Sequence, residues 1–146
     1  MTDQGAIQVR RIASKADLDR AFEIRRVVFL VEQQVSPDLE YDADDERAIH
    51  VLALSGDQAV ATGRLILHDD HARIGRMAVL ADYRKRGVGR AILEELLRAA
   101  REQGAHRIVL HAQVQAIGFY ESLGFRAFGA VFDEAGIPHR MMDRVL

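Results

Sequence analysis

The segment 79–92 holds the residues with the clearest chemistry in this sequence, because a basic turn with two glycines joins a strand-like run to an amphipathic helix. The first backbone N–H groups of a helix lack internal partners and carry a partial positive charge. Gly87 and Gly89 have no Cβ, so a bound group can approach the backbone closely. Four basic side chains surround the same amides: Arg84, Lys85, Arg86 and Arg90. This arrangement predicts an anion site suited to a diphosphate.

Two familiar phosphate-binding loops do not fit this segment. The P-loop requires G-x-x-x-x-G-K-[ST], and no lysine followed by serine or threonine comes after either glycine. The dinucleotide fingerprint G-x-G-x-x-G requires a third glycine where Ile92 stands. The remaining pattern, Arg84-x-x-Gly87-x-Gly89 between a strand and a helix, resembles the [QR]-x-x-G-x-[GA] loop of the GCN5-related N-acetyltransferases, the GNAT family. In that family the loop holds the pyrophosphate of coenzyme A.

A second pattern lies about thirty residues further on, where a buried strand at 107–112 precedes the segment 113–125. The segment is similar to the second GNAT signature, N-x-x-A-x-x-[FL]-Y-x-x-x-G-[FY]. It departs from the signature at Gln113, where many members carry asparagine. Five residues fall in register with it: Ala116, Phe119, Tyr120, Gly124 and Phe125.

Further segments are similar to the ElaA/YjcF-type branch of the family. They are Arg25-x-x-Val28-Phe29-x-x-Glu32-Gln33, an acidic loop ending near His50, His111-Ala112-Gln113, and Gly136-Ile137-Pro138-His139. The resemblance runs from about Arg25 to Met141. It implies a GNAT (acyl-CoA N-acyltransferase) fold of the α/β class, with a mixed, mostly antiparallel sheet flanked by helices. It also implies acetyl-CoA as the acyl donor, and it implies no particular acceptor.

The resemblance assigns the residues that hold the donor. Amides of the strand that feeds the loop polarise the acetyl carbonyl, and the loop and the second signature contact the rest of the cofactor. The implied cofactor-binding residues are Met77, Ala78, Val79, Arg84, Lys85, Arg86, Gly87, Val88, Gly89, Arg90, Gln113 and Tyr120.

Acetyl transfer to an amine also needs a group that removes a proton from the amine and one that protonates the departing thiolate. Tyr120 is the candidate acid, because a phenol is protonated at pH 7; the alternative is an aromatic side chain that only packs. Glu32, His111 and His139 are the candidates for the base and for binding the acceptor, and His111 is placed best at its strand end. Three carboxylates are secondary candidates for the base, namely Glu40, Asp42 and Asp45. A water relay without a dedicated base remains open.

The segment 38–46 holds six carboxylates in nine positions. It could steer a cationic amine toward the site, but we expect a solvated surface loop. The six histidines match no zinc-binding spacing, so no metal site is predicted. The basic residues near position 85 are local and lack interleaved aromatics, which argues against a nucleic-acid surface.

Composition sets wider limits. A chain of 146 residues with a net charge of −2 is predicted to form one domain, 1–146. Cysteine is absent, which excludes disulfides, thiolate metal ligands and a cysteinyl acyl intermediate. No signal peptide or membrane-spanning run is recognised, so a cytoplasmic location is expected. A homodimer is plausible from the family alone.

The pattern of apolar residues predicts the elements that position these groups. Strands are expected at 7–12, 49–54, 59–67, 72–79, 107–112, 127–132 and 141–145. Ser14 is predicted to cap a helix reaching about Val31, and a second helix runs from about Val88 to Gln103, ended by Gly104. A short helix follows the strand at 107–112.

The sequence thus predicts an N-acetyltransferase that moves acetyl from acetyl-CoA to a primary amine, by direct attack in a ternary complex. A small-molecule acceptor is favoured over a protein lysine. The alternative is a module of the same fold that binds CoA or an acyl-CoA as a sensor, without turnover.

Overall fold

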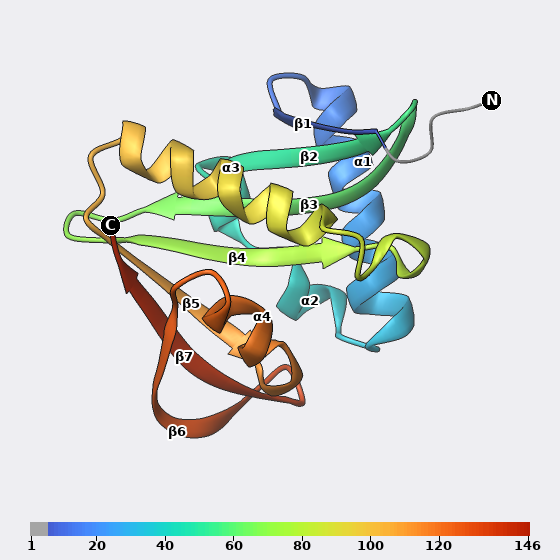
Figure 1. The fold of residues 1–146 in the computed structure, drawn as a ribbon. Helices are drawn as coiled ribbons and strands as arrows, with labels where there is room; N and C mark the ends of the chain where they lie inside the picture. The colour runs from blue at the N-terminus through green and yellow to red at the C-terminus, as the bar shows by residue number, and fades with distance from the viewer. Residues whose placement is uncertain (1–5) are drawn as a thin grey trace.

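A computed structural model describes residues 6–146, which form a seven-stranded mixed sheet with helices on both faces (Figure 1). The order across the sheet is β1-β2-β3-β4-β5-β7-β6, and every neighbouring pair is antiparallel except β4 with β5. The α/β class and the mostly antiparallel sheet predicted from the sequence are confirmed. The strands are β1 (Ile7–Arg11), β2 (Ile49–Ser55), β3 (Gln58–Leu67), β4 (Ala72–Val79), β5 (Arg107–Gln113), β6 (Arg126–Glu134) and β7 (Ile137–Val145).

The predicted long helices are present, and their ends follow the expected chemistry. Ser14 Oγ accepts a hydrogen bond from the amide of Asp17 at the start of the first helix. Gly104 follows the second with φ +82°, a conformation that glycine adopts readily. The helical segments are α1 (Lys15–Arg25), η1 (Arg26–Glu32), α2 (Pro37–Glu40), η2 (Ala43–Glu46), η3 (Ala81–Tyr83), α3 (Val88–Glu102), η4 (Val114–Ala116) and α4 (Ile117–Glu121).

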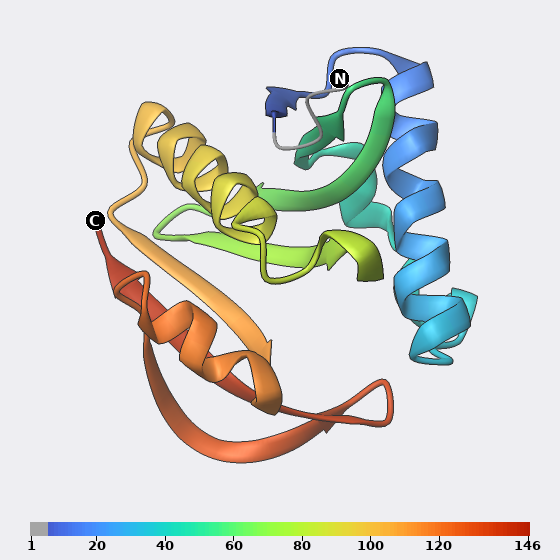
Figure 2. The same cartoon turned by 45° about the vertical axis from the view of Figure 1, so that its right-hand side comes forward.

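Two apolar cores lie on the two faces of the sheet. The larger one joins α3 and α4 to the sheet, and its centre is the predicted stripe of α3 with Ile92, Leu93 and Leu96 fully buried. Gly63 in β3 allows this packing, because a Cβ there would lie 2.8–2.9 Å from side-chain atoms of Met77, Ile92 and Leu96. The smaller core joins α1 and η1 to the opposite face, as Figure 2 shows for α1.

The sheet consists of two leaves that meet at a short junction. β4 pairs with β5 over only three positions, from Ala72↔Ile108 to Ile74↔Leu110. Beyond the junction β4 continues antiparallel to β3 while β5 pairs on its other side with β7. We name β1–β4 the first leaf and β5–β7 the second leaf; Figure 2 shows them turned away from each other. A register shift in β4, where Arg76 has φ +52°, lies just past the junction.

Two element boundaries differ from the prediction. The helix expected to reach Val31 changes after Arg25 into the π-helical segment η1, in which the amide of Gln33 donates to the carbonyl of Val28. β7 begins at Ile137, four residues before the expected strand, although Pro138 lies in it. β5 pairs with β7 only from His139 onward, so Pro138 stands where β7 has a partner on one side.

Candidate active site

The end of β4 presents backbone amides on the side where the leaves part. The amide of Leu80 donates to the carbonyl of Val60 in β3 at 2.9 Å. Because successive N–H groups alternate in an extended strand, the amide of Val79 points away from β3, toward the parted edge. By the same alternation the amide of Ala78 points toward β3, and Met77 lies between Ala78 and the irregular Arg76. Of the three predicted strand residues, Val79 and Met77 are therefore better placed than Ala78 to offer amides.

The glycine loop after β4 leads directly into the start of α3. Gly87, the N-cap of α3, has φ +81° and supplies no side-chain cap, so the amides of Val88, Gly89 and Arg90 have no capping partner among residues 6–146. Lys85 also has a left-handed φ, +60°. These features give the loop the geometry of an anion-binding nest.

Gly89 is not required by the packing of the protein. Its φ is not left-handed, and an added Cβ would lie 3.6 Å from Phe119 and Val79, at ordinary contact distance. A glycine that neither the backbone nor the neighbours demand lets a bound group approach the backbone amides at the helix N-terminus more closely than a residue with a side chain would. The residues present therefore fit a diphosphate group.

The basic side chains of the loop have partners of their own. Arg84 donates through Nε to the carbonyl of Val79 at 2.9 Å, and its Nη2 pairs with Glu32 at 2.8 Å. The guanidinium of Arg86 lies 5.4 Å from the ring centre of Tyr83. Arg84 thus connects the glycine loop to the end of β4 through the carbonyl of Val79.

Tyr120 lies in α4 and is buried against Phe125 and Phe119, with ring centres 6.0 Å and 5.0 Å apart. Burial raises the pKa of Tyr120 to about 12. Among residues 6–146 no group hydrogen-bonds its hydroxyl, and aromatic packing alone does not use that hydroxyl.

The end of η1 spans the two leaves. Glu32 pairs with Arg84 in the loop after β4, whereas Gln33 exchanges side-chain amide hydrogen bonds of 3.0 Å and 3.3 Å with Gln113 at the end of β5. Consecutive residues therefore contact the first and the second leaf. Glu32 is therefore paired with the glycine loop, whereas the carboxylate beside the two candidate histidines is Glu134.

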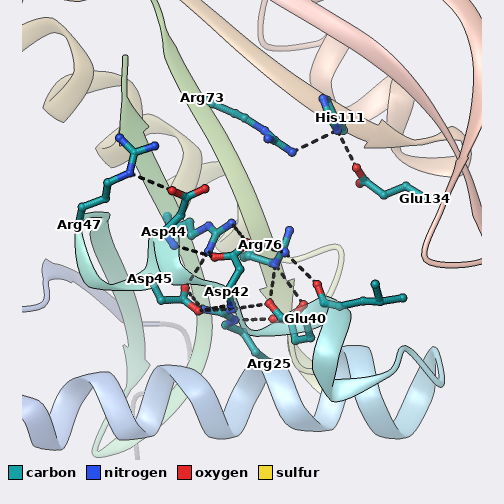
Figure 3. Close-up of polar contacts among 12 residues, drawn as sticks. Arg25, Glu40, Asp42, Asp44, Asp45, Arg47, Arg73, Arg76, His111 and Glu134 are labelled. Atoms are coloured by element: carbon teal, nitrogen blue, oxygen red, sulfur yellow. Dashed lines mark hydrogen bonds and ion pairs between the residues drawn. The ribbon is translucent and has the colours of Figure 1, made fainter. Parts of the chain in front are cut away.

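His111 and His139 come together on the second leaf through Glu134. Glu134 Oε1 lies 2.8 Å from His111 Nδ1, and its Oε2 lies 3.5 Å from His139 Nε2. Phe132 packs edge-on against His111 and stacks on His139. Arg73 of β4 reaches across from the first leaf, with Nη2 3.2 Å from His111 Nδ1 (Figure 3).

Sequence reasoning missed Glu134, Arg73 and Gln33. A signal for Glu134 was available, because Ala135-Gly136 is a two-residue turn that sets β6 against β7 with Glu134 opposite Ile137. That register brings Phe132 opposite His139 and places Glu134 on the same face as both. No comparable local signal marks Arg73, whose partner lies 38 residues away. Gln33 belongs to the branch-like segment 25–33, but its partner lies 80 residues away and its contact could not be inferred.

The acidic segment is not the solvated loop that the sequence led us to expect. Glu40 is buried, and its Oε1 accepts a hydrogen bond from Arg25 at 2.5 Å. Asp45 binds Arg25 at 2.7 Å and Arg64 at 2.8 Å, and Asp42 binds Arg64 at 2.7 Å (Figure 3). Arg25 and Arg64 retain 1% and 2% of their exposed area. Arg25 of α1 and Arg64 of β3 therefore engage Glu40, Asp42 and Asp45, and these three carboxylates are not free to act as bases, whereas Asp38 and Glu46 remain exposed.

The same cluster reaches the bulge in β4. Arg76 donates to the carbonyl of Glu40 at 3.0 Å and pairs with the carboxylates of Glu40 and Asp42 at 3.2 Å. Hydrogen bonding from Arg64 lowers the pKa of Asp42 to about 2, whereas burial raises the pKa of Glu40. The charge cluster, defined as Arg25, Glu40, Asp42, Asp45, Arg64 and Arg76, thus fixes the position where β4 leaves the junction.

Breaking this cluster should be far more costly than breaking an exposed ion pair one residue away. Arg25→Met leaves Glu40 and Asp45 without their shared cation, and removing one member of a buried pair costs about 3–5 kcal/mol. We expect urea denaturation to show a loss of that size. Arg26→Met is the matched control, because Arg26 pairs with the half-exposed Glu23 and should cost below about 1 kcal/mol. Equal losses in the two variants would contradict the structural role of the cluster.

Two further properties of the described residues bear on function. Within 6–146 no group of three or more histidine, aspartate or glutamate side chains is arranged to hold a metal ion. None of the helices in that range is long and apolar enough to cross a membrane.

Comparison with known proteins agrees with this geometry. The model of the Acetyltransferase (GNAT) family matches residues 18–125. The chain is 39% identical over 141 residues to the Bacillus subtilis protein YyaT, covering 94% of this chain and 95% of that protein. It is 35% identical over 130 residues to YjcF of Bacillus subtilis, named as an uncharacterized N-acetyltransferase, covering 88% and 93%. The crystal structure of Escherichia coli ElaA superposes with a TM-score of 0.85 at 29% identity, covering 95% of this chain and 99% of ElaA.

The chain belongs to the GNAT family, in the branch of ElaA and YjcF. Its fold is the GNAT acyl-CoA N-acyltransferase fold, and it is an acetyl-CoA-dependent N-acetyltransferase. The resemblance inferred from the two sequence signatures is confirmed.

Proposed function

We propose that this enzyme acetylates the primary amine of a small molecule by direct attack within a ternary complex. One observation carries the proposal: past the three-residue junction, β4 offers backbone amides on one side and β5 offers His111 on the other. A donor held by the first leaf would meet an acceptor held by the second in the space between them. The absence of cysteine from the sequence excludes a route through a cysteinyl acyl intermediate.

The donor would be held by the first leaf and its loop. The free amides of Val88, Gly89 and Arg90 would receive the pyrophosphate, and Lys85 and Arg86 would add charge around it. The amides of Met77 and Val79 would align the pantetheine and polarise the acetyl carbonyl. Gln113, the longer amide at the asparagine position of the signature, is held by Gln33 at the opposite edge.

Two side chains would carry out the proton transfers of the reaction. His111 would accept the proton of the attacking amine, because it is the first residue of β5 beyond the pairing with β4 and a neutral imidazole nitrogen can act as a general base. Tyr120 would donate a proton to the departing thiolate, because its raised pKa keeps the phenol protonated and its hydroxyl has no partner within residues 6–146. His139 would bind the acceptor beside His111.

The ion pair with Arg84 supports a different role for Glu32. The carboxylate of Glu32 is already engaged by the guanidinium of Arg84 at 2.8 Å, so Glu32 is better suited to order the glycine loop than to accept a proton. A small amine is favoured over a protein lysine because the end of η1 and the β6–β7 turn converge on the acceptor side. Gln33 contacts Gln113, and Ala135 and Ile137 pack against the core of α1 and η1.

Thermal melting with separate additions of acetyl-CoA, CoA, ATP and NAD tests the donor assignment. A ligand at a hundred times its dissociation constant adds about 2.7 kcal/mol of stability, which raises the melting temperature of a domain of this size by roughly 5–10 °C. We expect that shift with both CoA species and none with NAD. An equal shift with ATP would overturn the assignment. A CoA shift without thiol release from any amine in a panel would favour the sensor alternative.

A further inference from the structure

Two side chains of opposite hydrogen-bonding character compete for one ring nitrogen of His111. Glu134 Oε1 lies 2.8 Å from Nδ1, and Arg73 Nη2 lies 3.2 Å from the same atom. A carboxylate only accepts hydrogen bonds and a guanidinium only donates them. The two contacts therefore require opposite protonation of Nδ1, and each selects a different neutral tautomer of the ring.

The choice of tautomer decides whether the ring can act as a base at its other nitrogen. When Nδ1–H donates to Glu134, the lone pair lies on Nε2, which is free to take a proton from an amine. When Arg73 donates to Nδ1, Nε2 carries the hydrogen and offers no lone pair. The shorter contact favours the first tautomer.

The position of Glu134 is rigidly set. The turn after it places Ala135 at φ +55° and Gly136 at φ +78°, as a tight two-residue hairpin requires. Ala135 and Ile137 anchor this turn against the core of α1 and η1. Phe132 fixes the ring of His111 edge-on at 5.3 Å between centres. Neither the carboxylate nor the imidazole has to be ordered when an acceptor arrives.

Neighbouring charges keep Glu134 ionised. The hydrogen bond from His111 lowers the pKa of Glu134, and His139 and Arg73 act in the same direction. His139 Nδ1 lies 2.7 Å from the carbonyl of Ile137, to which it must donate. Its Nε2 faces Glu134 Oε2 at 3.5 Å, so protonation of His139 converts that contact into an ion pair. Arg73 of β4, Glu134 of β6 and His139 of β7 are the charged or titratable groups that face His111.

We propose that Glu134 is a positioning residue that holds His111 in the tautomer with a free Nε2 lone pair, against the opposing hydrogen bond from Arg73. This inference rests on the proposed function of His111 as the base. Glu134 does not touch the reacting atoms; it acts through the ring.

Glu134→Gln tests the inference, because an amide keeps the shape of the side chain and removes the charge that outweighs Arg73. We expect kcat to fall about 10²–10³-fold, with the KM for acetyl-CoA unchanged. Long-range ¹H–¹⁵N spectra of the ligand-free protein, recorded at a pH where titration shows the ring to be neutral, should show Nδ1–H in the wild type and Nε2–H in the variant. Asp133→Asn, which removes the adjacent exposed charge, should change neither result.

The double variant Glu134→Gln/Arg73→Met provides the rescue. Without the guanidinium, the amide oxygen of Gln can again accept from Nδ1–H, so about tenfold of the lost kcat should return together with the wild-type tautomer. A wild-type ring with the hydrogen on Nε2, or a tautomer unchanged by Glu134→Gln, would overturn the inference. Full activity in His111→Gln would instead refute the proposed base, while the spectra would still report whether Glu134 controls the ring.

Discussion

Gly89→Asp is expected to weaken the binding of coenzyme A sharply while leaving the fold at least as stable as in the wild type. A Cβ at this position would meet Phe119 and Val79 at the ordinary contact distance of 3.6 Å, without a clash. Residue 89 is the second residue of α3, where a carboxylate interacts favourably with the helix dipole. The same carboxylate would occupy and repel the site of the pyrophosphate. We expect the dissociation constant for CoA, measured by calorimetry, to rise more than about 100-fold, or roughly 2.7 kcal/mol.

Two further variants separate the effect of added side-chain volume on CoA binding from the effect of added negative charge. Gly89→Ala adds only the methyl group and should weaken CoA binding by a smaller factor, because the backbone amides remain. Gln103→Glu adds the same negative charge just past the far end of α3 and should leave CoA binding unchanged. Wild-type affinity in Gly89→Asp would remove the glycine loop from the donor site.

Tyr120→Phe is the second change with a large expected effect. The hydroxyl has no hydrogen-bond partner within residues 6–146, so its removal should cost little stability and leave the affinity for CoA unchanged. Loss of the proton donor should lower kcat by about 10²–10⁴-fold. Because the pKa of Tyr120 is raised to about 12, the phenol stays protonated up to that pH. The wild-type rate should therefore show no alkaline decline near pH 10 from this group.

Tyr83→Phe is the matched control. The hydroxyl of Tyr83 is exposed and donates to Gln58 at 3.3 Å, and Tyr83 precedes the glycine loop without belonging to the proposed proton path. We expect its kcat to stay within a factor of two of the wild type. If Tyr120→Phe behaved in the same way, Tyr120 would be a packing residue and the thiolate would be protonated by another group.

The elements that carry the proposed donor site were predictable from the sequence because their determinants are local. The α3 stripe, the capping residue Ser14 and the loop from Arg84 to Gly89 all depend on the spacing of neighbouring residues. The requirement for glycine at position 63 could not be predicted. It arises because α3 packs so closely on β3 there that a Cβ would clash with Ile92 and Leu96. The change from α-helix to π-helix after Arg25 could not be predicted either, because the apolar pattern of η1 continues that of α1.

The acidic segment shows why the acceptor half was harder to predict. Six carboxylates within nine residues suggest solvent exposure when no cationic partner can be recognised in the sequence. Their partners were not recognisable, because Arg25 lies 15 residues from Glu40 and Arg64 lies 22 residues from Asp42. The pairing of Glu134 with His111 likewise joins β6 to β5 through β7. Such contacts depend on sheet order and register, which hydrophobic periodicity does not specify.

The closing hairpin of β6 and β7 lies outside the stretch of the chain that the family model covers. Every group that we assign to the donor, from Met77 to Tyr120, falls inside the stretch 18–125 shared with the family model, whereas Glu134 and His139 lie beyond it on the closing hairpin. Substitutions in that hairpin could redirect the enzyme to a new amine without disturbing the loop that holds the common donor.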